Sequence, residues 1–516
     1  MLTRIRPDEN QAACCHPAFE GTASQSRRSA GAMVRICEAR FPQIFPWRLE
    51  YNCPVHENWN IVHTGMLIPQ THQIYVCSLN CLRGVVMTAD EMGCPDRISA
   101  VMPTQGEVVG GRLEEITIEG TSDLIGRFPE RPRAIELFLV CMHHLCGVDE
   151  RYIFRELRRR FPDIDFMSCW MDPIMQKVSL TPEQKQRRSM MAVVPKLPEN
   201  PRTVSIFGDN LRLPESSDIS RLLESLGIRI RQVMDCRDYD AYLRMGDSFL
   251  YMTRSALSVC GLRALSEKND RPFLYLPPVA LDEQIREGLL KLLETIEQAE
   301  GKAGRCFLAD SREGELHLRL QAEAGLTVRE NQALFREKML VKFLKERRAR
   351  AKEAFSRAKA VIGDTEVWMD YLAFPRPLSM ARRLLQEGFV VTRVCLDSVS
   401  PEEKAYFDWL QQHQPGLMLQ STSHVEAREK KRISSSAQVG QGKGHPILAL
   451  GPKAAFFAGT PYFVNWIENN GNWGYDGLEK LASEMIDSYR NPKDLRDIVQ
   501  RKGLGLPSLP EREEDR

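Results

Sequence analysis

Three cysteines in the first third of the chain stand in settings that suit a metal-binding thiol. Cys53 lies in YNCPVHENWN, Cys77 ends the strand-like run HQIYVC, and Cys141 ends the apolar run AIELFLVC. The last setting places a thiol at the carboxyl end of a strand, where parallel sheets form their ligand sites. A helix that begins nearby would lower the pKa of such a thiol and favour the thiolate, the form that binds metal. The residues therefore indicate metal ligation at the end of a sheet.

The spacing of these cysteines does not match the common local metal motifs. Cys77 and Cys81 form C-x3-C rather than C-x2-C, and no second pair completes a zinc site. A ferredoxin-type run of clustered cysteines is also missing. Cys81 and Cys146 each lie about one helical turn from Cys77 and Cys141, which makes them alternative or additional ligand candidates. For each cysteine, a small buried residue of the core is the competing interpretation.

Three further side chains could take part in chemistry. His143 and His144 follow Cys141, and imidazole titrates near neutral pH, so either could act as an acid or a proton shuttle. Capping a helix or filling a subunit interface is the interpretation that we favour for both. Arg254 follows a predicted strand and could face an anionic substrate, although we favour a surface ion pair.

The bulk composition is that of an ordinary globular protein. A length of 516 residues predicts about three domains at roughly 150 residues each. With 70 basic and 69 acidic residues the formal net charge is +1, which favours neither nucleic acid nor an anionic membrane as a partner. The chain has no long uncharged apolar run and its first 32 residues lack the apolar core of a signal peptide. We therefore expect a cytoplasmic protein, whose 14 cysteines stay reduced.

Short apolar strands alternate with amphipathic helices over most of the chain. Thr203–Phe207 is a strand candidate, helical spacing from Ile219 to Leu226 follows, and Gly227 ends that helix. The same unit recurs with strands at 228–233, 249–252, 273–276, 368–371, 389–394, 447–450 and 462–466. Such alternation predicts the α/β class, with parallel sheets covered by helices on both faces.

Composition and periodicity divide the chain into six predicted segments. They are a disordered extension at 1–33, an α/β domain with the three cysteines at 34–200, a second α/β domain at 201–327, a long connecting helix at 328–360, a third α/β domain at 361–500 and a tail at 501–516. The proline-rich segment 195–202 is a predicted linker, and the polar segment 426–444 a predicted loop. The charges of the long helix predict a solvated face.

The order of these motifs resembles the nitrogenase component-1 family, which includes nitrogenase subunits, cofactor-assembly scaffolds and tetrapyrrole-reducing relatives. In that family three cysteines of the first domain bind an iron–sulfur cluster at a subunit interface. Cys53, Cys77 and Cys141 occupy the matching positions, and CMHHLCGVD resembles the third motif. VSIFGDN, YMTRS with PFLYLPP, and GNWGYDG resemble later family motifs, so the similarity covers roughly residues 45–495. The resemblance implies three Rossmann-like parallel-sheet domains around a central cleft.

Two positions depart from the family pattern. Nitrogenase holds its active-site cofactor with a cysteine in the second domain and a histidine in the third, and the matching residues here are Met252 and Trp473. A thioether is a weak ligand and an indole has no acceptor lone pair. We therefore expect no nitrogenase-type molybdenum cofactor, and reduction of dinitrogen is disfavoured.

The resemblance also implies partners. No phosphate-binding P-loop is present, because GQGKGHP lacks the required spacing and the Ser or Thr. A separate ATP-hydrolysing iron protein would then deliver electrons, and a homologous subunit in a heterotetramer, or a second copy, would complete a [4Fe–4S] or larger cluster. The expected function is an oxidoreductase, active only with its partners, that relays electrons to an unidentified tetrapyrrole-like or small organic substrate. The alternatives are a non-catalytic scaffold for cluster or cofactor assembly, and a structural subunit whose cysteines stay empty.

Overall fold

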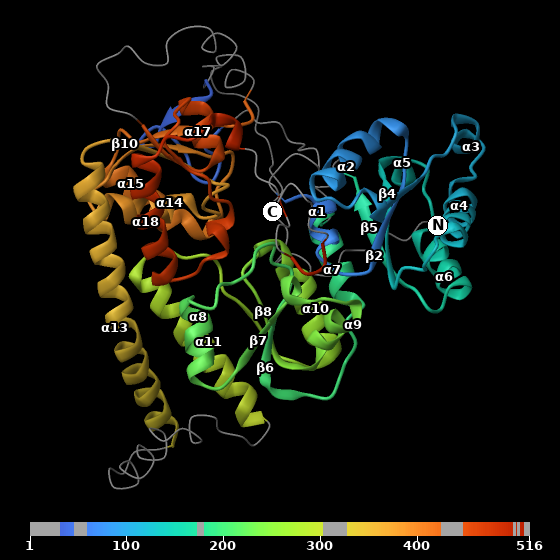
Figure 1. Cartoon of the computed structure of the whole chain (residues 1–516), viewed down its shortest axis with the longest axis horizontal. Coiled ribbons are helices and arrows are strands. Elements are labelled where there is room, and N and C mark those ends of the chain that lie inside the picture. The colour runs from blue at the N-terminus through green and yellow to red at the C-terminus, as the bar shows by residue number, and fades with distance from the viewer. Residues whose placement is uncertain are drawn as a thin grey trace, which may run out of the picture.

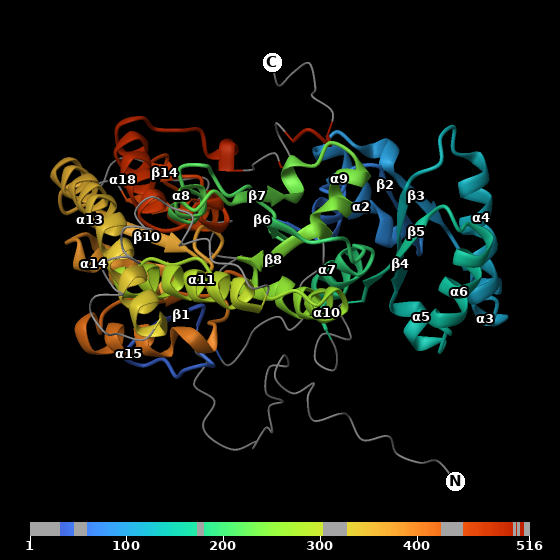
Figure 2. The ribbon, with the colours of Figure 1, turned by 90° about the horizontal axis from the view of Figure 1, so that it is seen from below.

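The computed structural model describes residues 31–45, 59–172, 180–302, 328–424, 447–498, 502 and 506–509. It contains three separate sheets built mainly of parallel strands, each covered by helices. The first sheet lies at one end of the molecule, the third at the other end, and the second between them (Figures 1 and 2). The predicted α/β class with three Rossmann-like sheets is thus confirmed.

The first sheet has four parallel strands in the order β3 (Ile98–Val101), β2 (Thr71–Val76), β4 (Ala134–Val140) and β5 (Asp165–Met171). Every residue of β2 and β4 is buried, because helices lie on both faces. The outer face packs against α4 (Leu113–Arg127) and α6 (Glu150–Arg160), and the inner face against α1 (Ile61–Met66) and α7 (Pro182–Ala192) (Figure 1). Three helices follow strand ends: α2 (Leu79–Glu91), α3 (Gln105–Val109) and α5 (Cys141–Leu145).

The second sheet also has four parallel strands, in the order β7 (Arg229–Gln232), β6 (Asn200–Ile206), β8 (Ser248–Thr253) and β9 (Phe273–Tyr275). Its helices are α8 (Asp218–Ser225), α9 (Tyr239–Leu243), α10 (Val259–Asn269) and α11 (Asp282–Lys302). The strands predicted here are confirmed. The prediction of a linker at 195–202 is wrong for its last three residues, because these residues begin β6. Proline is tolerated near the start of a strand, so Pro201 does not prevent strand pairing.

The third sheet has six strands, in the order β1 (Met33–Arg35), β12 (Met418–Gln420), β11 (Val390–Cys395), β10 (Glu366–Asp370), β13 (Leu448–Leu450) and β14 (Phe463–Val464). The helices of this part are α14 (Pro377–Gln386), α15 (Lys404–His413), α17 (Pro452–Ala458) and α18 (Tyr475–Arg490). All neighbouring strands are parallel except β1, which pairs antiparallel with β12 at the edge. The blue β1 therefore lies among the orange elements of the third sheet (Figure 2), although its residues stand at the predicted start of the first domain.

A long helix, α13 (Val328–Ile362), spans the segment that the sequence marks as charged and helical. It buries an apolar face that includes Ala351 and Phe355. The prediction that the charged side chains of this helix face solvent is wrong for Arg347. Its guanidinium is largely buried and lies 2.6 Å from the buried Asp218 carboxylate. In the part of the chain that the structure describes, none of the helices is both long and apolar enough to cross a membrane.

Candidate functional site

Cys77 and Cys141 stand at the same edge of the first sheet. Cys77 directly follows β2, and Cys141 directly follows β4 as the first residue of α5. The two strands are parallel neighbours, with Tyr75 opposite Phe138, so their carboxyl ends lie side by side. We call this region the carboxyl edge: residues 77–81, 102, 141–146 and 172, which follow β2, β3, β4 and β5. Cys53, the third predicted ligand, lies outside the described residues.

The thiol of Cys77 is fully buried. Its backbone N–H donates a hydrogen bond to the carbonyl oxygen of Val101, at 3.0 Å, which holds the residue against β3. Burial raises the pKa of Cys77 to about 12, and the neighbouring Cys81 adds to the shift. The nearby start of α2 does not lower the pKa of Cys77, because loss of solvation dominates. A metal that binds here has to displace the thiol proton.

The thiol of Cys141 is half-buried and faces the neighbouring strand. Its Sγ lies 3.8 Å from the carbonyl oxygen of Met171, the last residue of β5. A sulfur–oxygen contact of this length is a weak hydrogen bond. Cys77 follows β2, which lies on the other side of β4 from β5.

The two alternative cysteines are exposed at the same edge. Cys81 is the third residue of α2, with its Sγ 3.5 Å from Oγ of Ser78. Cys146 is the residue at which α5 ends. Both thiols are therefore open to a partner chain or a reagent, in contrast to Cys77.

The two adjacent histidines have different environments. His143 is buried, and its Nδ1 accepts a hydrogen bond from the backbone N–H of Val140 at 3.1 Å, so the favoured interpretation of helix capping is confirmed for it. Burial lowers the pKa of His143 to about 4. His144 is partly exposed, and its Nε2 lies 2.6 Å from Oδ2 of Asp172. Nothing in the local sequence pairs these two residues.

Asp172 and Lys185 are parts of this site that the sequence did not indicate. Asp172 directly follows β5 and is fully buried, and Nζ of Lys185 donates a hydrogen bond to its Oδ2 at 3.0 Å. The rule that drew attention to Cys141, a functional side chain just after a strand, would also have found Asp172. The ring of His144 stacks on that of Trp170, with centroids 3.9 Å apart and planes 12° from parallel. The carboxyl edge thus combines thiols with an ordered imidazole–carboxylate pair.

The sequence matches no protein-family model and no curated protein. The structure is similar to that of "Nitrogenase Cp1 at pH 6.5", with 13% identity, coverage of 90% of this chain and 98% of that chain, and a TM-score of 0.56. It is similar also to "Nitrogenase Cp1 at pH 5", with 11% identity, coverage of 91% and 96%, and a TM-score of 0.53. The chain has a nitrogenase component-1-like fold. The resemblance expected from the motifs is thereby confirmed at the level of the fold.

Within this component-1-like fold, the two departures from the family pattern lie in packed core. Met252, in β8, and Trp473, before α18, are both buried in the largest apolar cluster. The Trp473 Nε1–H donates a hydrogen bond to the carbonyl oxygen of Pro277 at 2.8 Å. Its ring lies so close to Gly288 of α11 that an added Cβ would be 2.8 Å from Cζ2. These two side chains fill space and offer no strong ligand, so they do not fit a nitrogenase-type cofactor.

Arg254 belongs to a buried junction of the component-1-like fold rather than to its surface. Its Nε lies 2.6 Å from Oδ2 of Asp209, and its Nη2 donates a hydrogen bond to the carbonyl oxygen of Leu211 at 2.6 Å. Its Nη1 donates to the carbonyl oxygen of Gly471, which connects the second sheet to the third part of the chain. The predicted surface ion pair is wrong in its location, because the pair is buried. Burial and full pairing leave Arg254 no role in holding a substrate anion.

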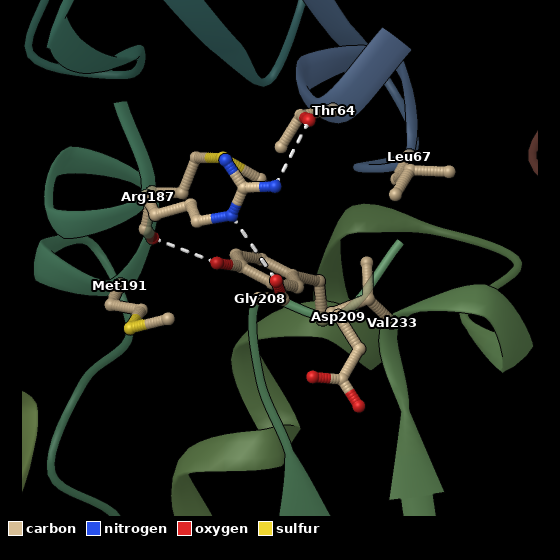
Figure 3. A pocket seen from close by; sticks show the side chains of 9 residues that line it. Thr64, Leu67, Arg187, Met191, Gly208, Asp209 and Val233 are labelled. Atoms are coloured by element: carbon tan, nitrogen blue, oxygen red, sulfur yellow. Dashed lines mark hydrogen bonds between the residues drawn. The ribbon is translucent and has the colours of Figure 1, made fainter. Parts of the chain in front are cut away.

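A small cavity lies where the first and second sheets meet (Figure 3). Arg187, which is fully buried, spans it, with Nε donating to the carbonyl oxygen of Gly208 at 3.2 Å. Its Nη2 donates to Oδ1 of Asn210 at 2.9 Å. The cavity has room for about one water molecule, as does a second one beside Trp473. Neither could hold an organic substrate.

The donor chemistry of the carboxyl edge fits an iron–sulfur cluster only in part. Cysteine thiolates are the usual ligands of such clusters, and Cys77 and Cys141 supply two at adjacent strand ends. Among the described residues no three His, Cys, Asp or Glu side chains are grouped so as to hold a metal ion. The described residues of one chain therefore do not supply a complete ligand set.

Proposed function

We propose that this chain is a subunit of a nitrogenase-like two-component oxidoreductase and that Cys53, Cys77 and Cys141 hold part of an iron–sulfur cluster at the carboxyl edge. One observation carries the proposal: Cys77 and Cys141 end neighbouring parallel strands of a component-1-like fold. The electrons come from a separate ATP-hydrolysing iron protein. The substrate is a tetrapyrrole-like or other small organic molecule bound by the assembled complex.

The surroundings of the thiols suit a redox centre. The rings of Tyr75 and Phe138 stack beneath the edge, with centroids 4.4 Å apart, and belong to the same apolar cluster as Cys77. An apolar floor excludes water from one side of a cluster. Solvent exposure and hydrogen bonds to sulfur are the means by which a protein sets the potential of such a centre.

A partner subunit would cover the exposed apolar side chains of this edge. Leu79 is 71% exposed, Met102 56% and Leu145 78%, and each stands just after β2, β3 or β4. Large apolar side chains gathered on one surface are characteristic of protein–protein contacts. The partner is a homologous component-1 subunit or a second copy of this chain, and it completes the ligand set.

A second candidate function is a scaffold for the assembly of a metal cluster or cofactor. The burial of Met252 and Trp473, together with one-water cavities at the sheet junctions, favours it, because the described part of the chain shows no substrate-sized space there. Turnover of an added substrate by the assembled complex, with an iron-protein donor, would exclude the scaffold. Transfer of iron and sulfide to an apo-acceptor without turnover would exclude the oxidoreductase.

The test is the iron and acid-labile sulfide content of the anaerobic complex, co-expressed with the proteins encoded beside it. Cys77→Ala and Cys141→Ala are compared with wild type. Cys37→Ala, an exposed cysteine that follows β1 of the third sheet, is the matched control. We expect stoichiometric iron in wild type and in the control, and loss of most of it in both test variants. Equal iron in all four proteins, or none in wild type, would contradict the proposal.

A further inference from the structure

The outward face of α2 is apolar where a surface helix is normally polar. Leu79 is 71% exposed, Val86 49% and Met87 64%. At the helical rotation of about 100° per residue, these three side chains lie with the exposed Arg83 and Asp90 within about 100° of the helix circumference. The buried residues of α2 lie on its other side. We call these five residues the α2 stripe.

The α2 stripe is part of a larger apolar surface at the carboxyl edge. Met102 is 56% exposed, Val109 82% and Leu145 78%. Met102 directly follows β3, Val109 ends α3, and Leu145 ends α5. Figure 1 shows α2, α3 and α5 together at the upper end of the first domain. Among the described residues, six of the 11 exposed large apolar side chains therefore belong to this one surface. Such a concentration is characteristic of a protein–protein contact.

The two charges of the α2 stripe are placed symmetrically about its centre. Arg83 precedes Val86 by three residues, and Asp90 follows Met87 by three. A two-fold axis through the midpoint between Val86 and Met87 therefore brings Arg83 of one chain level with Asp90 of the other, and the reverse. A parallel arrangement of the same faces would instead set Arg83 against Arg83 and Asp90 against Asp90. The charges thus favour one orientation, the antiparallel one.

We propose that the α2 stripe is the contact between two copies of this chain, with their α2 helices packed antiparallel about a two-fold axis. The inference rests on the proposed function, in which a second subunit covers the carboxyl edge, and it names that subunit as a second copy. The contact is isologous, because the same residues are buried on both sides. Helices packed through Val86 and Met87 lie about 8–10 Å apart, a distance that the side chains of Arg83 and Asp90 can bridge together.

A second copy accounts for the charge pattern without a further assumption. The stripe holds one positive and one negative residue, so a second copy supplies both opposite charges at the required spacing. A different protein would match the stripe only if its own charges had that same spacing. A formal net charge of +1 also leaves little repulsion between two whole chains.

The test is the mass of the full-length chain, expressed alone and measured by sedimentation equilibrium over a range of concentrations. We expect a dimer for wild type. Arg83→Glu sets a carboxylate against a carboxylate in both pairs, and Asp90→Arg sets a guanidinium against a guanidinium. Each single variant should therefore raise the dissociation constant of the dimer by about tenfold or more.

Two further samples restore the opposite charges. The double variant Arg83→Glu/Asp90→Arg exchanges the charges in both pairs and should dimerise like wild type. An equimolar mixture of the two single variants should also dimerise, because each chain then complements the other at both positions. Arg155→Glu, at an exposed position of α6, is the control and should dimerise like wild type.

The outcomes separate this inference from the proposed function, because the mass measurement does not depend on iron. A monomeric wild type would overturn the inference, as would single variants that dimerise like wild type or a double variant as weak as the single ones. An unchanged unfolding temperature in each variant shows that a lost dimer does not come from misfolding. A dimer without iron in any complex would support the α2 contact and contradict the proposed function, whereas iron in a complex of different subunits, with a monomeric chain on its own, would do the reverse.

Discussion

The thiol of Cys141 lies 3.8 Å from the carbonyl oxygen of Met171, on the side of β4 that faces β5. At the end of the same strand, Oδ2 of Asp172 lies 2.6 Å from Nε2 of His144, whereas Cys77 follows β2 on the other side of β4. The side-chain polar contacts described here therefore lie on the β5 side of the carboxyl edge, whereas the Cys77 thiol lies buried on the β2 side.

The cysteines of the carboxyl edge should differ sharply in their reaction with a thiol reagent. In the metal-free chain, Cys81 and Cys146 are exposed and should be labelled within minutes by a maleimide at mildly alkaline pH. Cys77 is buried with its pKa raised to about 12, so it should be labelled at least tenfold more slowly. Mass spectrometry of the labelled peptides measures the three rates, and denatured chain is the control. Equal rates for Cys77 and Cys81 in the folded chain would contradict the burial of Cys77.

Stability should fall as the pH rises through neutrality because of Glu136. This carboxyl is buried in β4, accepts hydrogen bonds from Gln73 and Gln186, and has its pKa raised to about 7 by burial. A folded-state pKa above the unfolded value stabilises the fold below the unfolded pKa, and this contribution is lost as the pH passes about 7. Between about pH 5 and about pH 8 the loss is on the order of 2 kcal/mol.

The variant Glu136→Gln should remove most of this pH dependence. Its amide can also donate to Oε1 of Gln186, which has no hydrogen-bond partner among the described residues. Urea unfolding of wild type, Glu136→Gln and the exposed control Glu267→Gln at the two pH values measures the effect. A wild-type slope that survives in Glu136→Gln would assign the dependence to another group.

The pair of Arg254 and Asp209 should be strongly coupled. Arg254→Met leaves the buried Asp209 carboxylate without its guanidinium, which typically costs about 3–5 kcal/mol of unfolding free energy. The double variant with Asp209→Asn should recover part of that loss, because no uncompensated charge remains. Arg496→Met, in an exposed pair with Asp494, is the matched control and should leave the unfolding midpoint unchanged. Additive effects in the double variant would contradict the coupling.

The contact of Gly288 with Trp473 leaves no room for a methyl group. Gly288→Ala would place Cβ 2.8 Å from Cζ2 of the indole, so we expect a loss of about 1–3 kcal/mol in unfolding free energy. Gly126→Ala in α4, where an added Cβ would meet no atom outside its own stretch of helix within 4 Å, should cause no loss. Adding Trp473→Phe to Gly288→Ala should relieve the overlap. Thermal unfolding of the three variants measures this, and an unchanged midpoint in Gly288→Ala would show that the indole has space to move.

The local sequence was enough to predict the fold class and one part of the site. Apolar runs of strand length, each followed by a helical spacing and a glycine stop, depend only on neighbouring residues, and β6, α8 and β7 lie where this pattern puts them. The placement of Cys77 and Cys141 just after strands is equally local. The motif order added the resemblance to component 1, which the shared fold supports.

Only the tertiary structure decided which of these residues meet. The pairing of β1 with β12, the contact of His144 with Asp172 and the burial of Arg254 each join segments far apart in the chain, and no local pattern encodes such pairs. The same holds for the pKa of Cys77, which the start of a helix alone would lower but complete burial raises. Sequence thus determined the elements and the side chains available at their ends, whereas packing decided the solvation and the partners of those side chains.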